Sequence, residues 1–150
     1  MDEALCFGWI DSIAKPLDSD RYMQFFSKRK PGGGWSKINK EKIRKLTEEG
    51  LMSQAGLDAI VVAKQNGSWM LLDEVEELIV SDDLANALAE NATARYFFQK
   101  LSKSDKRHLL YWVSSAKRED TRRKRIEEIV EFTGQNLKPK ILIWTKKVDA

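Results

Sequence analysis

The residues with the clearest chemical potential lie at positions 28–39, which read KRKPGGGWSKIN. Three consecutive glycines follow a basic triplet, as in loops that surround phosphate groups. A nucleotide P-loop, however, requires G-x-x-x-x-G-K-[ST] after a buried strand, and a dinucleotide loop requires G-x-G-x-x-G. Here Trp35 follows the last glycine and Lys37 comes only after Ser36, so neither spacing is present. We therefore do not expect this loop to bind a nucleotide.

The same loop can still form a simpler anion site. Arg29 and Lys30 precede the expected start of a helix, where free N–H groups and the helix dipole favour negative charge. Ser36 and Asn39 supply further donors, and Trp35 can cover an aromatic or apolar part of a ligand. The alternative is structural: Trp35 anchors the loop in the core, and the basic side chains are solvated.

A second basic group lies at residues 116–130, which read AKREDTRRKRIEEIV. Local pairing is one explanation, because acids lie four residues from several of its basic residues and each such pair stabilises a helix by about 0.2–0.5 kcal/mol. The acidic residues 73–77 could also receive an arginine. The functional alternative joins four basic residues and the glycine-rich loop into one anion-binding surface: Lys117, Arg118, Arg122 and Arg125.

Catalysis and metal binding have little support in the sequence. The only cysteine, Cys6, excludes an internal disulfide and lies among apolar residues, where it is expected to pack. The only histidine, His108, excludes a His-rich metal site and is expected on an exposed helix flank. Asp11 has no second carboxylate to complete an acid–base pair. We expect no metal and no cofactor, and a binding protein in preference to an enzyme whose site is unrecognised.

The scaffold for these groups is predicted to be α+β and mostly α. Residues 9–29 carry aromatic and β-branched side chains on both sides of the turn-forming sequence PLDSD, which predicts an antiparallel β-hairpin. Gly8, just before it, is typical of the left-handed end of a helix. We expect this small hairpin to pack on a bundle of about five or six helices.

Helix starts are indicated by capping residues, and glycines at positions 50 and 67 indicate two helix ends. Residues 68–80 are ambiguous, and the tail at 136–150 has no helical period, which predicts a short strand or a frayed extension. We expect a single domain with parts at 1–38, 39–135 and 136–150. The helix starts are predicted at Asn39, Ser53, Ser81 or Asp82, Asn91, Ser102 and about Arg118, with Leu57, Ile60 and Val61 on the buried face of the second helix.

Composition and charge limit the class of protein. The longest apolar run near the C-terminus is far too short to cross a bilayer, and the acidic start lacks the basic region of a signal peptide, so we expect a cytoplasmic protein. Residues 15–45 and 101–125 are basic, whereas residues 58–90 are acidic. If the basic segments share a face, that face attracts anions, nucleic acid included. The alternative is internal pairing of the acidic and basic segments.

Several motifs together resemble the YdeI/OmpD-associated family, also called bacteriocin-protection proteins. They are Gly-Trp-Ile-Asp at 8–11, Trp-Ser-x-x-Asn at 35–39, Met-x-x-x-Gly-Leu at 52–57 and Ala-Lys-x-x-x-Thr-Arg-x-x-Arg-Ile at 116–126. The resemblance covers roughly residues 3–135. Family members usually carry a further N-terminal segment, so we expect this chain to lack it and to leave an open edge that could form an oligomer.

The resemblance implies a non-enzymatic protein that protects against stress or antimicrobial peptides. Its partner would be an anionic ligand or an amphipathic protein, bound through a basic surface that contains Trp35. The main alternative is a nucleic-acid-binding module, whose affinity would fall steeply as salt rises because each neutralised phosphate releases counterions.

Overall fold

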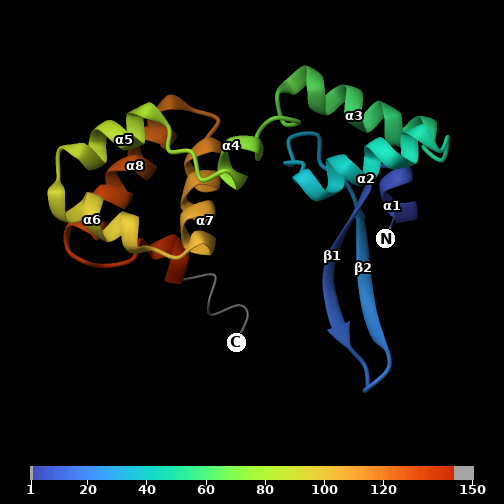
Figure 1. Cartoon of the computed structure of the whole chain (residues 1–150), viewed down its shortest axis with the longest axis horizontal. Coiled ribbons are helices and arrows are strands. Elements are labelled where there is room, and N and C mark those ends of the chain that lie inside the picture. Colours follow the sequence, from blue (N-terminus) through green and yellow to red (C-terminus); the bar gives the residue numbers. More distant parts are fainter. Residues whose placement is uncertain (1, 144–150) are drawn as a thin grey trace. The chain divides into compact units, whose positions relative to one another are not determined.

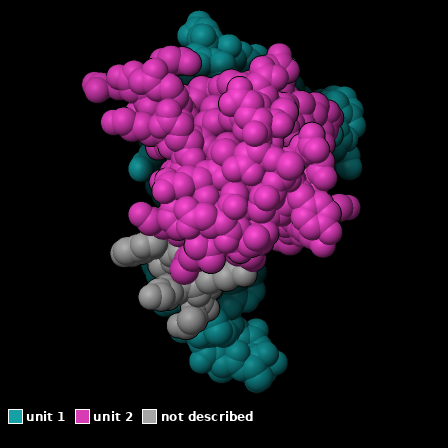
Figure 2. Space-filling view, turned by 90° about the vertical axis from the view of Figure 1, so that its left-hand side faces the viewer, with its two compact units in different colours: residues 1–73 teal, residues 74–150 magenta. Residues whose placement is uncertain are grey.

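The computed structural model describes residues 2–143, and its contacts divide the chain into two compact units, residues 1–73 and 74–150 (Figures 1 and 2). The sequence predicted a single domain with parts at 1–38, 39–135 and 136–150. The boundary between the units lies within the middle part, because the hairpin, the glycine-rich loop and the next two helices share contacts within the first unit. The mostly α, α+β fold class is confirmed.

The first unit contains an antiparallel β-hairpin and three helices. Gly8 has a φ of +75° and ends the first helix, as predicted. The strands pair from Trp9 opposite Lys28 to Pro16 opposite Tyr22, with an irregularity between Asp11 and Ala14. The elements are α1 (Asp2–Cys6), β1 (Trp9–Pro16), β2 (Tyr22–Lys28), α2 (Lys37–Glu48) and α3 (Gln54–Asn66).

The hairpin joins the helices only at its base, through α1. The backbone N–H and the hydroxyl of Ser53 donate hydrogen bonds to the carbonyl oxygen of Cys6, at 3.0 and 2.5 Å. Leu5 and Cys6 form a small buried cluster with Leu46 of α2. The free length of the hairpin then extends away from α2 and α3 (Figure 1). Its position is therefore set by the packing of one short helix.

The helix starts of the first unit follow the predicted caps with one exception. Ser53 caps α3 through the N–H of Gly56, and Gly67 ends that helix in the left-handed region. Asn39 was wrong as the cap of α2: the hydroxyl of Ser36 accepts from the N–H of Asn39, so the helix begins three residues earlier. Either polar residue could cap, and the extended backbone of Ser36 decides between them.

The buried face of α3 also differs from the prediction. Val61 was expected to pack, but 50% of its surface is exposed. The buried residues are Gly56, Ile60 and Ala63, so the stripe runs along the smaller side chains. A helix that buries glycine and alanine can approach its neighbours closely, which matters for the site described below.

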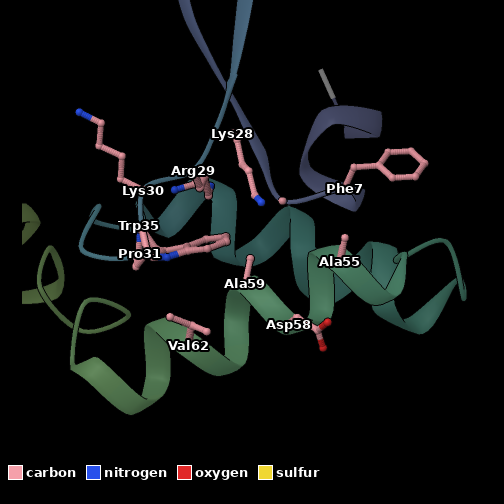
Figure 3. A pocket seen from close by; sticks show the side chains of 11 residues that line it. Phe7, Lys28, Arg29, Lys30, Pro31, Trp35, Ala55, Asp58, Ala59 and Val62 are labelled. Carbon is pink, nitrogen blue, oxygen red and sulfur yellow. The ribbon is translucent and has the colours of Figure 1, made fainter.

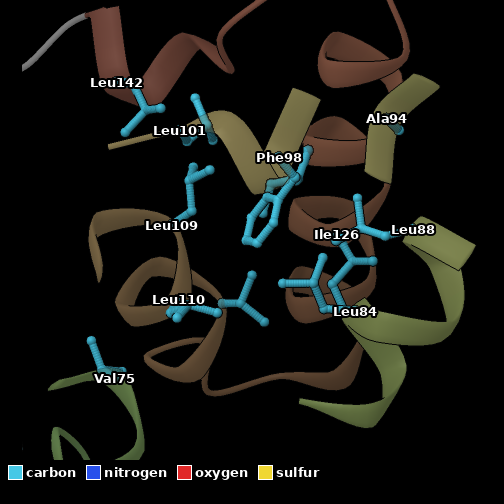
Figure 4. Close-up of a cluster of buried hydrophobic side chains, with 12 residues drawn as sticks. Val75, Leu84, Leu88, Ala94, Phe98, Leu101, Leu109, Leu110, Ile126 and Leu142 are labelled. Carbon is cyan, nitrogen blue, oxygen red and sulfur yellow. The ribbon is translucent and has the colours of Figure 1, made fainter. Parts of the chain in front are cut away.

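The second unit is a helical bundle around one apolar cluster (Figure 4). Asn91 and Ser102 cap their helices as predicted, through the N–H groups of Ala94 and Asp105. Ser81, and not Asp82, holds the cap position of α5. The elements are α4 (Asp73–Glu76), which starts at the boundary, then α5 (Asp82–Ala89), α6 (Ala92–Lys100), α7 (Lys103–Ser114) and α8 (Glu119–Gly134).

The described part of the tail is not the strand or frayed extension that the sequence predicted. Residues 140–143 are helical, and Leu142 is only 1% exposed within the apolar cluster (Figure 4). Lys138 donates to a carboxylate oxygen of Asp105 at 2.6 Å. Four residues are too few to show a helical period in sequence, so tertiary packing determines this turn. Residues 144–150 lie outside the described part of the chain.

Candidate anion-binding site

A cavity of about 300 Å³ lies in the first unit, between the base of the hairpin and α3 (Figure 3). Its basic side consists of Lys28, Arg29 and Lys30, at the point where β2 leads into the glycine-rich loop. Phe7 lies at one end, and the indole of Trp35 closes the inner side. The facing side comes from α3, which contributes the apolar residues Ala55, Ala59 and Val62 and the carboxylate of Asp58.

Small residues allow the hairpin base and α3 to approach each other. A Cβ atom on Gly8 would lie 3.2 Å from the Cβ of Ala59 and 3.3 Å from the carbonyl oxygen of Ala55. A Cβ on Gly56 would lie 2.1 Å from the carbonyl oxygen of Cys6. Larger side chains at these positions would separate α1 from α3 and open the cavity.

Arg29 is the central charged group of the site. The carbon of its guanidinium lies 3.7 Å from the ring centre of Trp35, a distance typical of a stacked cation–π contact. Its Nη1 donates to the carbonyl oxygen of Gly34 at 3.2 Å. Nε and Nη2 are buried and have no hydrogen-bond partner among the described residues. One complete edge of this guanidinium therefore lacks an acceptor.

Trp35 holds this arrangement in place. It is 3% exposed and packs at 5.2 Å, between ring centres, from the tilted ring of Trp69. Trp35 thus anchors the loop in the core, as the structural alternative predicted, and its ring is the platform for Arg29, while its contact with a ligand stays a prediction. Gly34 is also required here, since a Cβ would lie 2.7 Å from Cγ of Leu72.

The electrostatics of Arg29 favour an anion. Burial lowers the pKa of its guanidinium, while the negative charge of Asp11 raises it. Arginine nevertheless stays protonated in proteins, so the buried edge carries positive charge. A buried charge whose donors lack acceptors is costly, and an anion that reached Nε and Nη2 would remove that cost.

The other predicted residues of the loop lie outside the cavity or at its rim. Lys30 is exposed and its side chain extends away from Trp35, whereas Lys28 points inward toward the helices (Figure 3). Ser36 and Asn39 form the first turn of α2 and do not line the cavity. Sequence reasoning missed the α3 side altogether. Its one signal was the run of small residues at 55, 56 and 59.

The basic residues of α8 lie in the second unit, and two of them are engaged by neighbouring groups. Arg122 donates from Nε and Nη2 to the carboxylate of Asp83, at 2.5 and 2.9 Å. Arg125 donates from Nη1 to the carbonyl oxygen of Trp112 at 2.5 Å. Arg122 also reaches the carbonyl of Val113 at 3.4 Å, so both arginines bind the C-terminal carbonyls of α7.

Pairing within the unit explains part of the charge pattern. The guanidinium of Arg122 holds the pKa of Asp83 well below its usual range. Arg123 lies 4.0 Å from Glu127, one of the pairs that the four-residue spacing indicated, and 3.7 Å from Asp120, three residues away. Lys117 and Arg118 are exposed. A surface that joins these residues to the Arg29 loop remains a prediction, since the two sets lie in separate units.

Between residues 2 and 143, no group of three His, Cys, Asp or Glu side chains is arranged to hold a metal ion. No helix in this range combines the length and the apolar character needed to span a membrane.

Comparison with known families divides the chain in the same way as its contacts do. Residues 1–59 match a family described as a domain of unknown function (DUF8412). Residues 77–136 match the family described as bacteriocin-protection, YdeI or OmpD-associated. No curated protein and no solved structure matches the chain. Of the four motifs noted in the sequence, only the one at 116–126 lies within the second match. Residues 77–136 are therefore similar to the bacteriocin-protection, YdeI or OmpD-associated family, the family that the sequence resemblance indicated.

Proposed function

We propose that this is a non-enzymatic bacteriocin-protection protein that binds an anionic, partly apolar partner at the Arg29–Trp35 cavity. The family match supports the general role, and the site supports the mode of binding. The observation that carries the proposal is the buried Nε–Nη2 edge of Arg29, which has no acceptor among the described residues.

A comparison within the chain indicates what this edge can bind. Arg122 uses the same two nitrogens to hold both carboxylate oxygens of Asp83. A carboxylate or phosphate fits this fork because two parallel N–H···O bonds form at once. Arg29 also lines the cavity, together with Asp58, but its Nε and Nη2 have no partner among the described residues and are buried, so a ligand must displace a neighbouring side chain to reach them. The exposed side chains of Lys28 and Lys30 can move to admit an anion and add to its attraction.

The apolar remainder of the cavity suits a short side chain attached to the anion. Phe7, Ala59 and Val62 line it, and its volume of about 300 Å³ lies at the lower end of small-ligand pockets. The free carboxylate of a peptide, with one apolar residue next to it, has this combination. We therefore infer that the site captures the C-terminal end of a peptide, such as an antimicrobial peptide.

Peptide titration tests this mode of binding. The probe is an N-acetylated Ala-Val dipeptide with a free carboxylate, compared with its amidated form, and the indole NMR signal of Trp35 reports binding. Since hydrogen bonds to a charged group contribute about 1.5–3 kcal/mol, Arg29→Gln should weaken binding about tenfold or more. Arg107→Gln, which makes the same change at an exposed position, should have no effect.

Two outcomes would overturn this assignment. One is equal binding of the free and amidated peptides, and the other is unchanged binding by Arg29→Gln. At the level of the cell, the wild-type protein should raise the bacteriocin concentration needed to stop growth of a sensitive strain, and the Arg29 variant should not. Binding of nucleic acid has less support, because Arg122 and Arg125 are already engaged within the second unit.

A further inference from the structure

The β-hairpin leaves much apolar surface uncovered in the first unit. Tyr22 is 68% exposed, Ile13 62% and Phe25 44%. The sheet has only two strands, and an isolated two-stranded hairpin is marginally stable in water. Pairing of one edge with a further strand would cover part of the side chains on that strand and satisfy one row of unpaired backbone groups.

The two outer edges of the hairpin differ in how open they are. Strand β1 has a register irregularity between Asp11 and Ala14, then a charge at Lys15 and a proline at residue 16. Bulges, charges and proline are the features by which proteins protect an edge strand from pairing. Strand β2 has no proline or glycine, and its one charge, Lys28, is its last residue: residues 22–28 read YMQFFSK. The edge of β2 is therefore the one open to another strand.

We propose that β2 is the contact strand of a homodimer, in which the β2 strands of two copies pair antiparallel about a two-fold axis. A strand can pair antiparallel with its own copy in this way. The two-fold axis makes each contact occur twice: if residue i of one copy lies opposite residue j of the other, then j of the first lies opposite i of the second. The result is a four-stranded sheet. Centred on Phe25, the pairing places Lys28 opposite Tyr22 of the second copy, so no like charges meet. Phe25 then meets Phe25 of the second copy, Met23 lies opposite Ser27 and Phe26 lies opposite Gln24.

The exposed area indicates the strength of this dimer. A whole aromatic side chain has roughly 200 Å² of surface, so the exposed fractions of Tyr22, Met23, Phe25 and Phe26 leave about 400 Å² per copy. Edge pairing covers only part of this surface, because the side chains project from both faces of the sheet. Two copies would bury less than about 800 Å² of it, below the roughly 1,200 Å² of stable interfaces. We therefore expect a reversible dimer that dissociates on dilution.

Sedimentation velocity over micromolar to near-millimolar concentrations tests the proposal. The wild-type protein should shift from monomer to dimer as its concentration rises. Phe25→Lys should remain monomeric, because it would place a charge at the centre of the paired strands. Ile13→Lys is the matched control: it changes a more exposed apolar residue on β1 and should still form the dimer. Circular dichroism confirms that both variants are folded.

Disulfide trapping gives a second, independent measurement. Phe25→Cys should form a covalent dimer under mild oxidation, since the two-fold axis brings position 25 of both copies together. Ile13→Cys should not, and the native Cys6 is buried. A wild type that is monomeric at every concentration would overturn the proposal. So would equal loss of dimer in the two lysine variants, or equal cross-linking at positions 13 and 25.

Discussion

Replacing Gly56 with alanine would test the close contact between α1 and α3, on which both the position of the hairpin and the shape of the cavity depend. The new Cβ would lie 2.1 Å from the carbonyl oxygen and 2.8 Å from the carbonyl carbon of Cys6. It would also lie 2.9 Å from Cε of Met52, but that side chain is flexible and can move. The backbone at Cys6 cannot, because Ser53 holds its oxygen with two hydrogen bonds. Helix α1 must therefore separate from α3.

The energetic cost can be estimated from the contacts that separation removes. Uncovering Leu5 costs about 2 kcal/mol, within the range for a fully buried aliphatic side chain. Loss of the two hydrogen bonds from Ser53 to Cys6 costs about 1 kcal/mol each. The higher helix propensity of alanine offsets about 1 kcal/mol of this loss relative to glycine. We expect the first unit to lose on the order of 3 kcal/mol of unfolding free energy.

Native-state hydrogen exchange of amides in the first unit measures this loss separately from the second unit. Gly50→Ala is one control: its φ of +70° costs about 1 kcal/mol, but no atom lies within 4 Å of the new Cβ. Gly32→Ala is the other, since it meets no atom and no positive φ, and should change stability by about 0.5 kcal/mol or less. If Gly56→Ala cost no more than Gly50→Ala, the close approach of α1 and α3 would be wrong.

Two further predictions concern the second unit. Because Arg122 holds the pKa of Asp83 low, their contribution to stability is present above the ordinary aspartate pKa of about 4 and is lost as pH falls toward the lower folded value. Asp83→Asn should therefore flatten the acid side of the stability curve in urea titrations at several pH values, and an unchanged slope would contradict the pairing. Both side chains are partly exposed, so a double-mutant cycle should give a coupling of about 1 kcal/mol or less. Leu142→Ala should lower the midpoint of unfolding by the equivalent of about 2–5 kcal/mol, while Leu137→Ala, at a half-exposed position, should change it little, and equal effects would refute the packing of the last turn.

Local signals predicted most of the secondary structure correctly. Gly8, Ser53, Asn91 and Ser102 each act through backbone groups within a few residues, so their effect can be read from sequence. Residues 140–143 fail this rule, because their helical turn depends on a core built from distant helices. The division into two units was missed for the same reason: no composition change or linker sequence marks residue 73.

The candidate site was predictable in its residue types but not in its contacts. The sequence indicated Arg29 and Trp35 as members of one candidate loop, but not that the guanidinium stacks on the ring. The facing helix contributes Ala59 and Val62, about thirty residues away, and nothing in the spacing links the two segments. The partner of Arg122 lies 39 residues before it in the chain, at Asp83. Contacts at such separations depend on how helices pack, which a single sequence does not state.

Arg122 and Arg29 show why charge alone is a poor guide to the binding site. Arg122 belongs to the larger basic cluster, at residues 116–130. Its Nε and Nη2 both donate to Asp83, so this guanidinium forms an ion pair within the second unit. Arg29 belongs to a short triplet, yet the same edge lacks an acceptor in the described chain. A buried donor pair without a partner costs stability in the unbound protein. An anion bound to Nε and Nη2 would lower this cost, and it can enter through the cavity beside Arg29.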